Sequence, residues 1–149
     1  MNYALFGTPR FASIILSKLI DAGIPPALVI CNPDKPSGRK KVITPPLTKI
    51  LALENSIPIF QPEVLVNDKS KIINSKFEFG IVVAYAKIIP KEIINLFPKG
   101  IIGIHPSLLP KYRGASPIQQ AILEDVSETG VTLYLIDEKV DHGDILASN

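Results

Sequence analysis

The chain has 149 residues, of which 46% are hydrophobic and 20% charged, so the composition excludes a disordered chain and favours one globular domain, 1–149. The net charge of +2 gives no general affinity for nucleic acid, so any basic site must be local. One cysteine, Cys31, and two histidines cannot make an internal disulfide or fill a four-ligand zinc site, and no metal is expected.

The N-terminal elements are marked by a short apolar run and a glycine- and proline-containing turn. Residues 3–6 predict a buried strand, after which Thr8 is expected to cap a helix with Pro9 at its first position. Apolar residues then recur at helical spacing until Gly23, which is expected to end the helix. The start lacks a basic leader, and no apolar run approaches the roughly 18 residues of a membrane span. We therefore expect a cytoplasmic protein without membrane contact.

The remaining elements follow from apolar runs and their spacing. Strands are predicted at 27–31, 57–60, 79–84, 100–105, 129–136 and from 145 onward. Helices are predicted at 47–54, 90–97 and 117–123, with a loop and a short helix in 61–77 and loop-like connections at 32–46, 106–116 and 138–144. Strands that alternate with helices predict an α/β fold, an open and mostly parallel twisted sheet with helices on both faces. Ligands bind such sheets beyond the carboxyl ends of the strands.

Polar groups that could take part in a reaction follow three of these strands. His105 ends one strand and precedes a proline, which holds it extended with its ring expected in the crevice. A lone histidine of this kind is more often a capping or core residue. Asp141 and Asp144 flank Gly143 in a segment that, taken alone, is an ordinary turn. The segment 84–90 could line a flat ligand or simply begin a helix.

Together, these segments resemble the 10-formyltetrahydrofolate-dependent formyltransferases, especially the members that formylate methionyl-tRNA. The motifs occur in the expected order over essentially the whole chain: Phe6-Gly7-Thr8-Pro9, Pro33-Asp34-Lys35-Pro36-Ser37-Gly38-Arg39, Val83-Ala84-Tyr85, His105-Pro106-Ser107-Leu108-Leu109-Pro110, Tyr112-Arg113-Gly114 and Glu128-Thr129-Gly130-Val131-Thr132. The resemblance implies an N-terminal, folate-binding and catalytic domain that is incomplete at its C-terminal end and lacks the family's β-barrel domain. We expect a monomer.

The resemblance implies transfer of a formyl group from 10-formyltetrahydrofolate to the amino group of methionine on initiator tRNA. Such a reaction needs a hydrogen-bond donor for a developing oxyanion and a group that takes the amine proton. By position, His105 is the donor, and Asp141 keeps it protonated and helps to move the proton. The implied folate-binding residues are Tyr85, Ala86, Lys87, Ile88, Ile89, Pro90, Ser107, Leu108, Leu109, Pro110, Val140 and Asp141.

Two positions depart from the family pattern. Gly103 stands where the family has a catalytic Asn, and loss of one oxyanion donor lowers the rate by about 10²–10³. A bound water in the vacated space could recover part of that loss. Gly103→Asn is therefore expected to raise activity about a hundredfold if the other two groups are intact. Ala86 stands where the family usually has Gly, and it would carry roughly 1 kcal/mol of strain if its φ is positive.

Lys35, Arg39, Lys40 and Lys41 form a basic loop that the resemblance assigns to tRNA phosphates, which predicts binding that weakens steeply with salt. Without the resemblance, it would be a solvated surface loop.

Two other functions stay open: a catalytically impaired or non-catalytic folate- or tRNA-binding remnant, and a formyltransferase acting on an amino-sugar nucleotide. The basic loop argues against the second. A dinucleotide-binding enzyme is disfavoured because no G-x-G-x-x-G follows the first strand.

Overall fold

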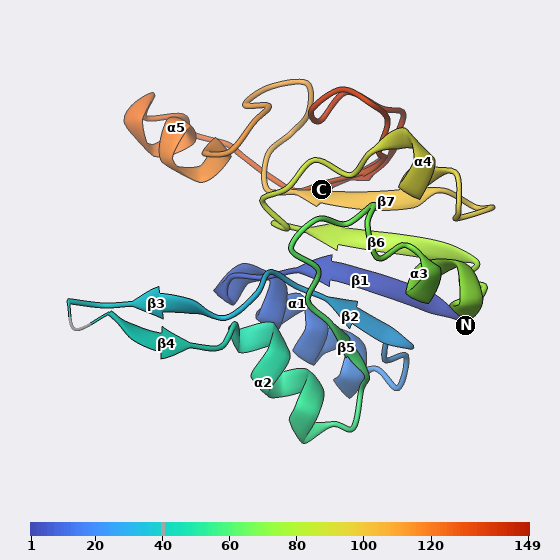
Figure 1. Cartoon of the computed structure of the whole chain (residues 1–149). Helices are drawn as coiled ribbons and strands as arrows, with labels where there is room; N and C mark the ends of the chain where they lie inside the picture. The colour runs from blue at the N-terminus through green and yellow to red at the C-terminus, as the bar shows by residue number, and fades with distance from the viewer. Residues whose placement is uncertain (40) are drawn as a thin grey trace.

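The computed structural model describes residues 1–39 and 41–149. Its main feature is a seven-stranded sheet in the order β5-β2-β1-β6-β7-β8-β9 (Figure 1). The strands are β1 (Tyr3–Gly7), β2 (Leu28–Ile30), β5 (Ile59–Phe60), β6 (Phe79–Val83), β7 (Ile101–His105), β8 (Thr132–Leu135) and β9 (Ile145–Ser148). The first five strands in this order are parallel, and β8 and β9 are antiparallel to their neighbours. The predicted mostly parallel sheet is confirmed.

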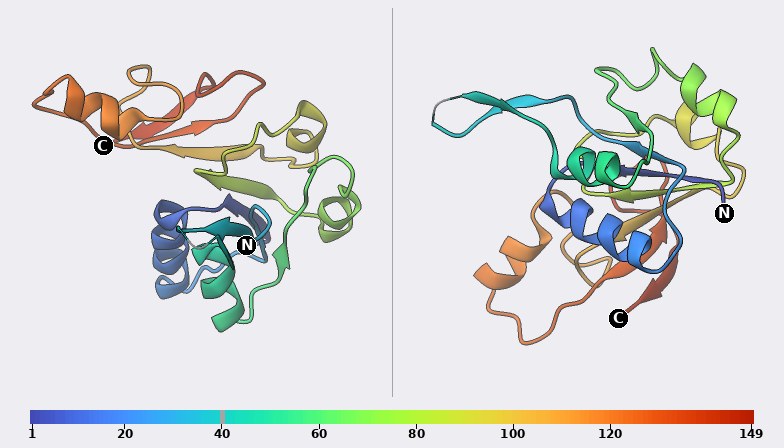
Figure 2. Two further views of the ribbon diagram at one scale, coloured as in Figure 1. Left: turned by 60° about the vertical axis from the view of Figure 1, so that its left-hand side comes forward. Right: turned by 90° about the horizontal axis from the view of Figure 1, so that it is seen from below.

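Helices cover both faces of the parallel part of the sheet, as predicted (Figure 2). On one face, α1 (Arg10–Asp21) and α2 (Leu47–Glu54) pack Leu16 and Ala52 against Leu5. On the other face, α3 (Ser70–Ser75) and α4 (Lys91–Ile94) enclose a core that includes Phe6 and Ile93. Leu5 and Phe6 serve opposite layers because successive strand residues point to opposite faces. A further helix, α5 (Pro117–Leu123), lies apart from these layers (Figure 1).

Gly7 sets the distance between β1 and α1. A Cβ at this position would lie 2.6 Å from the Cβ of Ala12 and 2.9 Å from the carbonyl oxygen of Val83. Real Cβ atoms do not approach backbone and methyl groups so closely, so only glycine fits here without a shift. The close approach places the start of α1 beside the carboxyl ends of β1 and β6.

Two local expectations from the sequence are wrong. Pro9, not Thr8, is the N-cap of α1, and no side chain in the described part of the chain caps that helix. Thr8 instead accepts a hydrogen bond of 3.1 Å from the backbone N–H of Asn32, which joins the loops after β1 and β2. The segment 32–46 is not only loop, because it contains the antiparallel hairpin of β3 (Lys35–Ser37) and β4 (Val42–Thr44).

The β3–β4 hairpin projects away from the sheet and is fixed at its base (Figures 1 and 2). Asp34 accepts hydrogen bonds of 2.8 and 2.9 Å from Lys49 and one of 2.8 Å from Gln61. Lys49 and then Gln61 lower the pKa of the Asp34 carboxyl, so it stays ionised near neutral pH. The hairpin is therefore held to the sheet at the end that joins it to β2.

Burial of ionisable groups predicts loss of stability at alkaline pH. Burial raises the pKa of Tyr3 and Tyr85 from 10.0 to about 12, and that of Cys31 from 9.0 to about 11. Above pH 9 the unfolded chain loses these protons while the folded chain retains them. The free energy of unfolding should therefore be unaffected by these groups below about pH 9. It should then fall toward pH 12 by up to about 1.4 kcal/mol per pH unit for each retained proton. Urea unfolding at pH 8, 10 and 11 measures this slope.

Two Tyr→Phe variants provide a matched comparison. The Tyr3 hydroxyl donates a 2.6 Å hydrogen bond to the carbonyl oxygen of Ile24, whereas the buried Tyr85 hydroxyl has no partner among the described residues. Tyr3→Phe should lose about 1 kcal/mol of stability at pH 7, and Tyr85→Phe should change it little. Both should reduce the alkaline slope. Equal losses at pH 7, or an unchanged slope, would contradict this assignment.

Candidate active site

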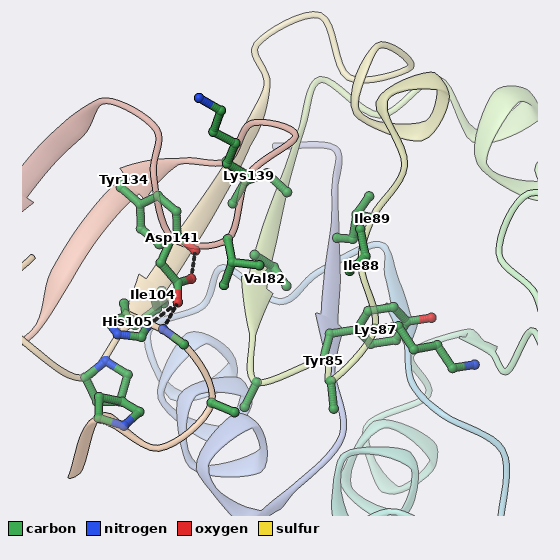
Figure 3. A pocket seen from close by; sticks show the side chains of 18 of the residues that line it. Val82, Tyr85, Lys87, Ile88, Ile89, Ile104, His105, Tyr134, Lys139 and Asp141 are labelled. Atoms are coloured by element: carbon green, nitrogen blue, oxygen red, sulfur yellow. Dashed lines mark hydrogen bonds and ion pairs between the residues drawn. The ribbon is translucent and has the colours of Figure 1, made fainter. Parts of the chain in front are cut away.

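A pocket of about 660 Å³ opens where β6 and β7 end, and it is the candidate active site (Figure 3). The adjacent parallel strands bring the segment after Val83 and the residue His105 to the same edge of the sheet. The loop after β8, the start of α1 and residues 114–117 supply further lining. Figure 3 shows His105, Tyr134 and Asp141 on one side of the pocket, and Tyr85, Ile88 and Ile89 on the other. The pocket therefore has a polar side and an apolar side.

The ring of His105 is held in a defined orientation by one backbone carbonyl group and one carboxylate. The side chain is 7% exposed, and its Nε2 lies 2.8 Å from the carbonyl oxygen of Tyr112. A carbonyl oxygen only accepts, so Nε2 carries a proton and donates it. The other ring nitrogen, Nδ1, lies 3.5 Å from Oδ2 of Asp141. Nδ1 is thus the ring atom that faces the carboxylate.

Asp141 receives hydrogen bonds from two different parts of the chain. Its Oδ2 accepts a 2.8 Å bond from the backbone N–H of Gly114, and its Oδ1 accepts a 2.6 Å bond from the hydroxyl of Tyr134. Asp141 has a positive φ of 48°, a conformation that costs a non-glycine residue energy and is concentrated at functional sites. These contacts fold the loop after β8 back across the sheet, so the sequence-predicted residues His105 and Asp141 lie together.

Gly103 lies beneath the ring of Tyr134. The two residues face each other across β7 and β8. A Cβ at Gly103 would overlap the Cε1 and Cζ atoms of Tyr134 and would lie 2.8 Å from its hydroxyl oxygen. The expected vacant space beside Gly103 is therefore not found, because a buried tyrosine fills it. Sequence reasoning missed Tyr134, since the partner of each β8 residue depends on a register that spacing alone does not give.

The residues expected to bind folate divide into two groups. Those that line the pocket are Tyr85, Ala86, Lys87, Ile88, Ile89, Val140 and Asp141. Pro90, Ser107, Leu108, Leu109 and Pro110 lie outside its lining. Ser107 is fully buried and donates a 2.6 Å hydrogen bond to the carbonyl oxygen of Lys111. The Leu109 N–H donates to the hydroxyl of Thr132 over 3.0 Å. The first bond closes a turn within the segment after His105, and the second fastens that segment to β8.

The segment after β6 has an unusual backbone. Ala84 and Ala86 have φ values of 48° and 61°, on either side of the buried Tyr85. Because its φ is positive, Ala86 carries the strain expected from the sequence. That strain is roughly 1–2 kcal/mol for an alanine in the left-handed conformation. The Tyr85 carbonyl oxygen accepts a 3.0 Å bond from the side chain of Asn32, which supports this conformation.

A second His–Asp pair lies outside the buried part of the site. His142 Nδ1 and Asp137 Oδ2 are 2.8 Å apart, and both side chains are more than 40% exposed. His142 lowers the pKa of the Asp137 carboxyl. Exposed pairs of this kind contribute little because water screens them. Within residues 1–39 and 41–149, no three His, Cys, Asp or Glu side chains gather as metal ligands.

Three of the four expected tRNA-binding residues lie on the described part of the β3–β4 hairpin. Lys35, Arg39 and Lys41 are exposed, and Lys40 lies outside the described residues. The hairpin leaves the sheet after β2, and none of these three residues lines the pocket. In the part of the chain that the structure describes, no helix is long and apolar enough to cross a membrane.

Comparison with known proteins gives one family match over the whole chain, "Formyl transferase", at residues 1–149. A methionyl-tRNA formyltransferase of Desulforamulus reducens is 46% identical over 148 residues, which are 98% of this chain and 47% of that protein. One of Thermodesulfovibrio yellowstonii is 48% identical over 143 residues, 95% of this chain and 46% of that protein. The chain thus spans about half the length of the curated relatives it matches.

Solved structures with the same fold are more distant in sequence. A phosphoribosylglycinamide formyltransferase from Bacillus halodurans has a TM-score of 0.80 at 22% identity, covering 100% of this chain and 78% of that one. A formyltetrahydrofolate deformylase from Pseudomonas syringae has a TM-score of 0.70, also at 22% identity, covering 99% of this chain and 50% of that one. These two proteins share one architecture but are named for different reactions, so the structural similarity establishes only the fold of this chain.

Proposed function

The chain belongs to the formyl transferase family, and from this premise we propose that it transfers a formyl group from 10-formyltetrahydrofolate to the amino group of methionyl-tRNA. The observation that carries the proposal is the buried pairing of His105 with Asp141 beside a pocket at the carboxyl edge of the sheet. The names of the curated relatives favour methionyl-tRNA over an amino-sugar nucleotide as the acceptor. We also propose that residues 1–149 act as the folate-binding and catalytic domain.

The pocket suits the pterin end of a folate. Its volume of about 660 Å³ lies within the range of roughly 300–1,000 Å³ found for small-molecule sites. Val82, Ile89 and Ile104 offer apolar surfaces to a flat ring, and Val140 also lines the pocket. The positive φ values of Ala84 and Ala86 turn the backbone out of the extended conformation directly after β6 in this wall. Bound there, 10-formyltetrahydrofolate would supply the formyl group.

His105 and Asp141 have different roles in the proposed reaction. Nε2 of His105 donates to the Tyr112 carbonyl oxygen, so Nδ1, which faces Asp141 beside the pocket, is the nitrogen left to hold a second proton. From there it can donate to an oxygen that gains negative charge during acyl transfer. The carboxylate of Asp141, 3.5 Å away, stabilises the protonated ring and can accept the proton that leaves the attacking amine.

The direct test is transfer of labelled formyl from 10-formyltetrahydrofolate. Purified chain is mixed with methionyl-tRNA, or with an amino-sugar nucleotide, and formylated product is counted over time. Transfer to methionyl-tRNA above the uncatalysed rate supports the proposal. Product only on the sugar would move the acceptor to that class. Calorimetric binding of folate with no product on either acceptor would leave a non-catalytic binding protein.

The β3–β4 hairpin should contribute to tRNA affinity through its basic side chains. Removing three charges together, with Lys35→Gln, Arg39→Gln and Lys41→Gln, should weaken methionyl-tRNA binding. If each contacts one phosphate, the slope of log K against log salt should fall by about 2 to 3, at roughly 0.7–0.9 per contact. Filter binding between 50 and 200 mM salt (roughly the range over which such contacts weaken) measures the slope.

The matched control removes three exposed lysines elsewhere: Lys18→Gln, Lys76→Gln and Lys99→Gln. Lys76 and Lys99 precede β6 and β7, at the sheet edge opposite His105. The control should leave the salt slope of binding close to that of the unchanged chain. Equal slopes for the two triple variants would show that the hairpin makes no specific contribution.

A further inference from the structure

Tyr134 and Gly103 form a reciprocal pair in which the tyrosine takes the volume of the side chain that glycine lacks. The phenol oxygen lies 2.8 Å from the position that a Cβ of residue 103 would occupy. Two successive covalent bonds span roughly 2.5 Å, which is the reach of an asparagine amide from its Cβ. The hydroxyl therefore lies at about the distance from that Cβ that the polar end of a short side chain at position 103 would have.

The hydroxyl is engaged with the reactive part of the site. It donates to Oδ1 of Asp141 over 2.6 Å, while Oδ2 accepts from Gly114 and faces Nδ1 of His105. Burial, and then the Asp141 carboxylate, raise the pKa of Tyr134. The phenol therefore keeps its proton near neutral pH and remains a donor. Each oxygen of Asp141 thus has its own partner, which fixes the rotation of the carboxylate.

We propose that Tyr134 is a positioning residue of the formyl-transfer site, which fills the space above Gly103 and holds the Asp141 carboxylate toward His105. The catalytic role of Tyr134 rests on the proposed function, but the contact of Tyr134 with Asp141 can be measured without turnover. It explains how a site with glycine at position 103 can still hold an ordered polar group near that residue. The group comes from the neighbouring strand β8 instead of from β7, and its one proton is donated to Asp141.

The test is Tyr134→Phe, which keeps the ring and removes only the hydroxyl. Loss of a hydrogen bond to a charged group should lower kcat about tenfold to a hundredfold. KM for the formyl donor should change little, because the hydroxyl acts through Asp141. The matched control is Tyr3→Phe, which also removes a buried hydroxyl with a 2.6 Å bond but lies outside the pocket. It should keep the kcat of the unchanged chain.

A second measurement needs no turnover: the ¹⁵N resonances of the His105 ring, recorded for the unchanged chain and both variants. If Tyr134 holds Asp141, Tyr134→Phe should shift these resonances and Tyr3→Phe should not. Transfer that is absent in the unchanged chain, together with this shift, would overturn the proposed function and support the placement. A Tyr134→Phe chain with unchanged kcat and unchanged His105 resonances would overturn the inference.

Discussion

Asp141→Asn should lower kcat for formyl transfer by about 10²–10⁴, the range that a positioned proton-transfer group contributes. The substitution keeps the shape of the side chain and removes its charge. Asparagine can still accept from the Gly114 N–H, so the loop should stay folded back over the sheet. What it cannot do is stabilise a protonated His105 or take up the amine proton. KM for the folate donor should change much less than kcat.

Asp144→Asn is the control for this variant. Asp144 lies in the same turn, its side chain is exposed, and it does not line the pocket. Steady-state rates with both substrates, compared with the melting temperature of each variant, separate chemistry from stability. A loss of activity that is equal in the two variants would place the effect in the turn and not in the carboxylate of Asp141.

Gly103→Asn should destabilise the fold and should not raise activity. The added Cβ overlaps the ring of Tyr134, so the tyrosine must leave its buried position and its bond to Asp141. Overpacking of a filled core costs about 1–3 kcal/mol, and the lost bond to a charged group adds about 1.5–3 kcal/mol. The structure thus gives the opposite expectation to the one that the sequence suggests for this substitution.

The double variant Gly103→Asn with Tyr134→Leu tests the reason for that effect. Leucine removes the ring that blocks position 103 and leaves an apolar side chain on β8. The double variant should recover the part of the stability loss that comes from overpacking, but not the part that comes from the lost bond to Asp141. The recovery appears as a coupling energy of at least about 1 kcal/mol in a double-mutant cycle. Urea unfolding of the four chains measures it. Additive effects would show that the two positions do not share one space.

The sequence predicts the parallel part of the fold well because its signals are local. Apolar runs separated by Gly7 and Gly23 mark β1, α1 and β2, and the strand ends place His105 at the correct edge of the sheet. The hairpin was missed because its described residues are exposed and its sequence combines Pro36 with several basic residues. No burial pattern marks β3 and β4, whose six residues are all exposed.

The candidate site was only partly predictable for a different reason. Motif order identified His105 and Asp141, which lie 3.5 Å apart at the polar side of the pocket. Tyr134 was not identified because its role depends on the antiparallel register that sets it opposite Gly103. Burial of Ser107 could not be derived either, since it follows from bonds to Lys111 and Thr132. Where such residues lie in the structure depends on long-range strand pairing and hydrogen bonds, and not on residue type.

The most direct test of the account is a crystal structure of the chain with a stable analogue of 10-formyltetrahydrofolate. The account predicts the pterin ring between the Tyr85–Ile89 segment and Val140, with the one-carbon end within hydrogen-bond reach of Nδ1 of His105. An analogue bound on another face of the molecule, or with its one-carbon end directed away from His105 and Asp141, would contradict it.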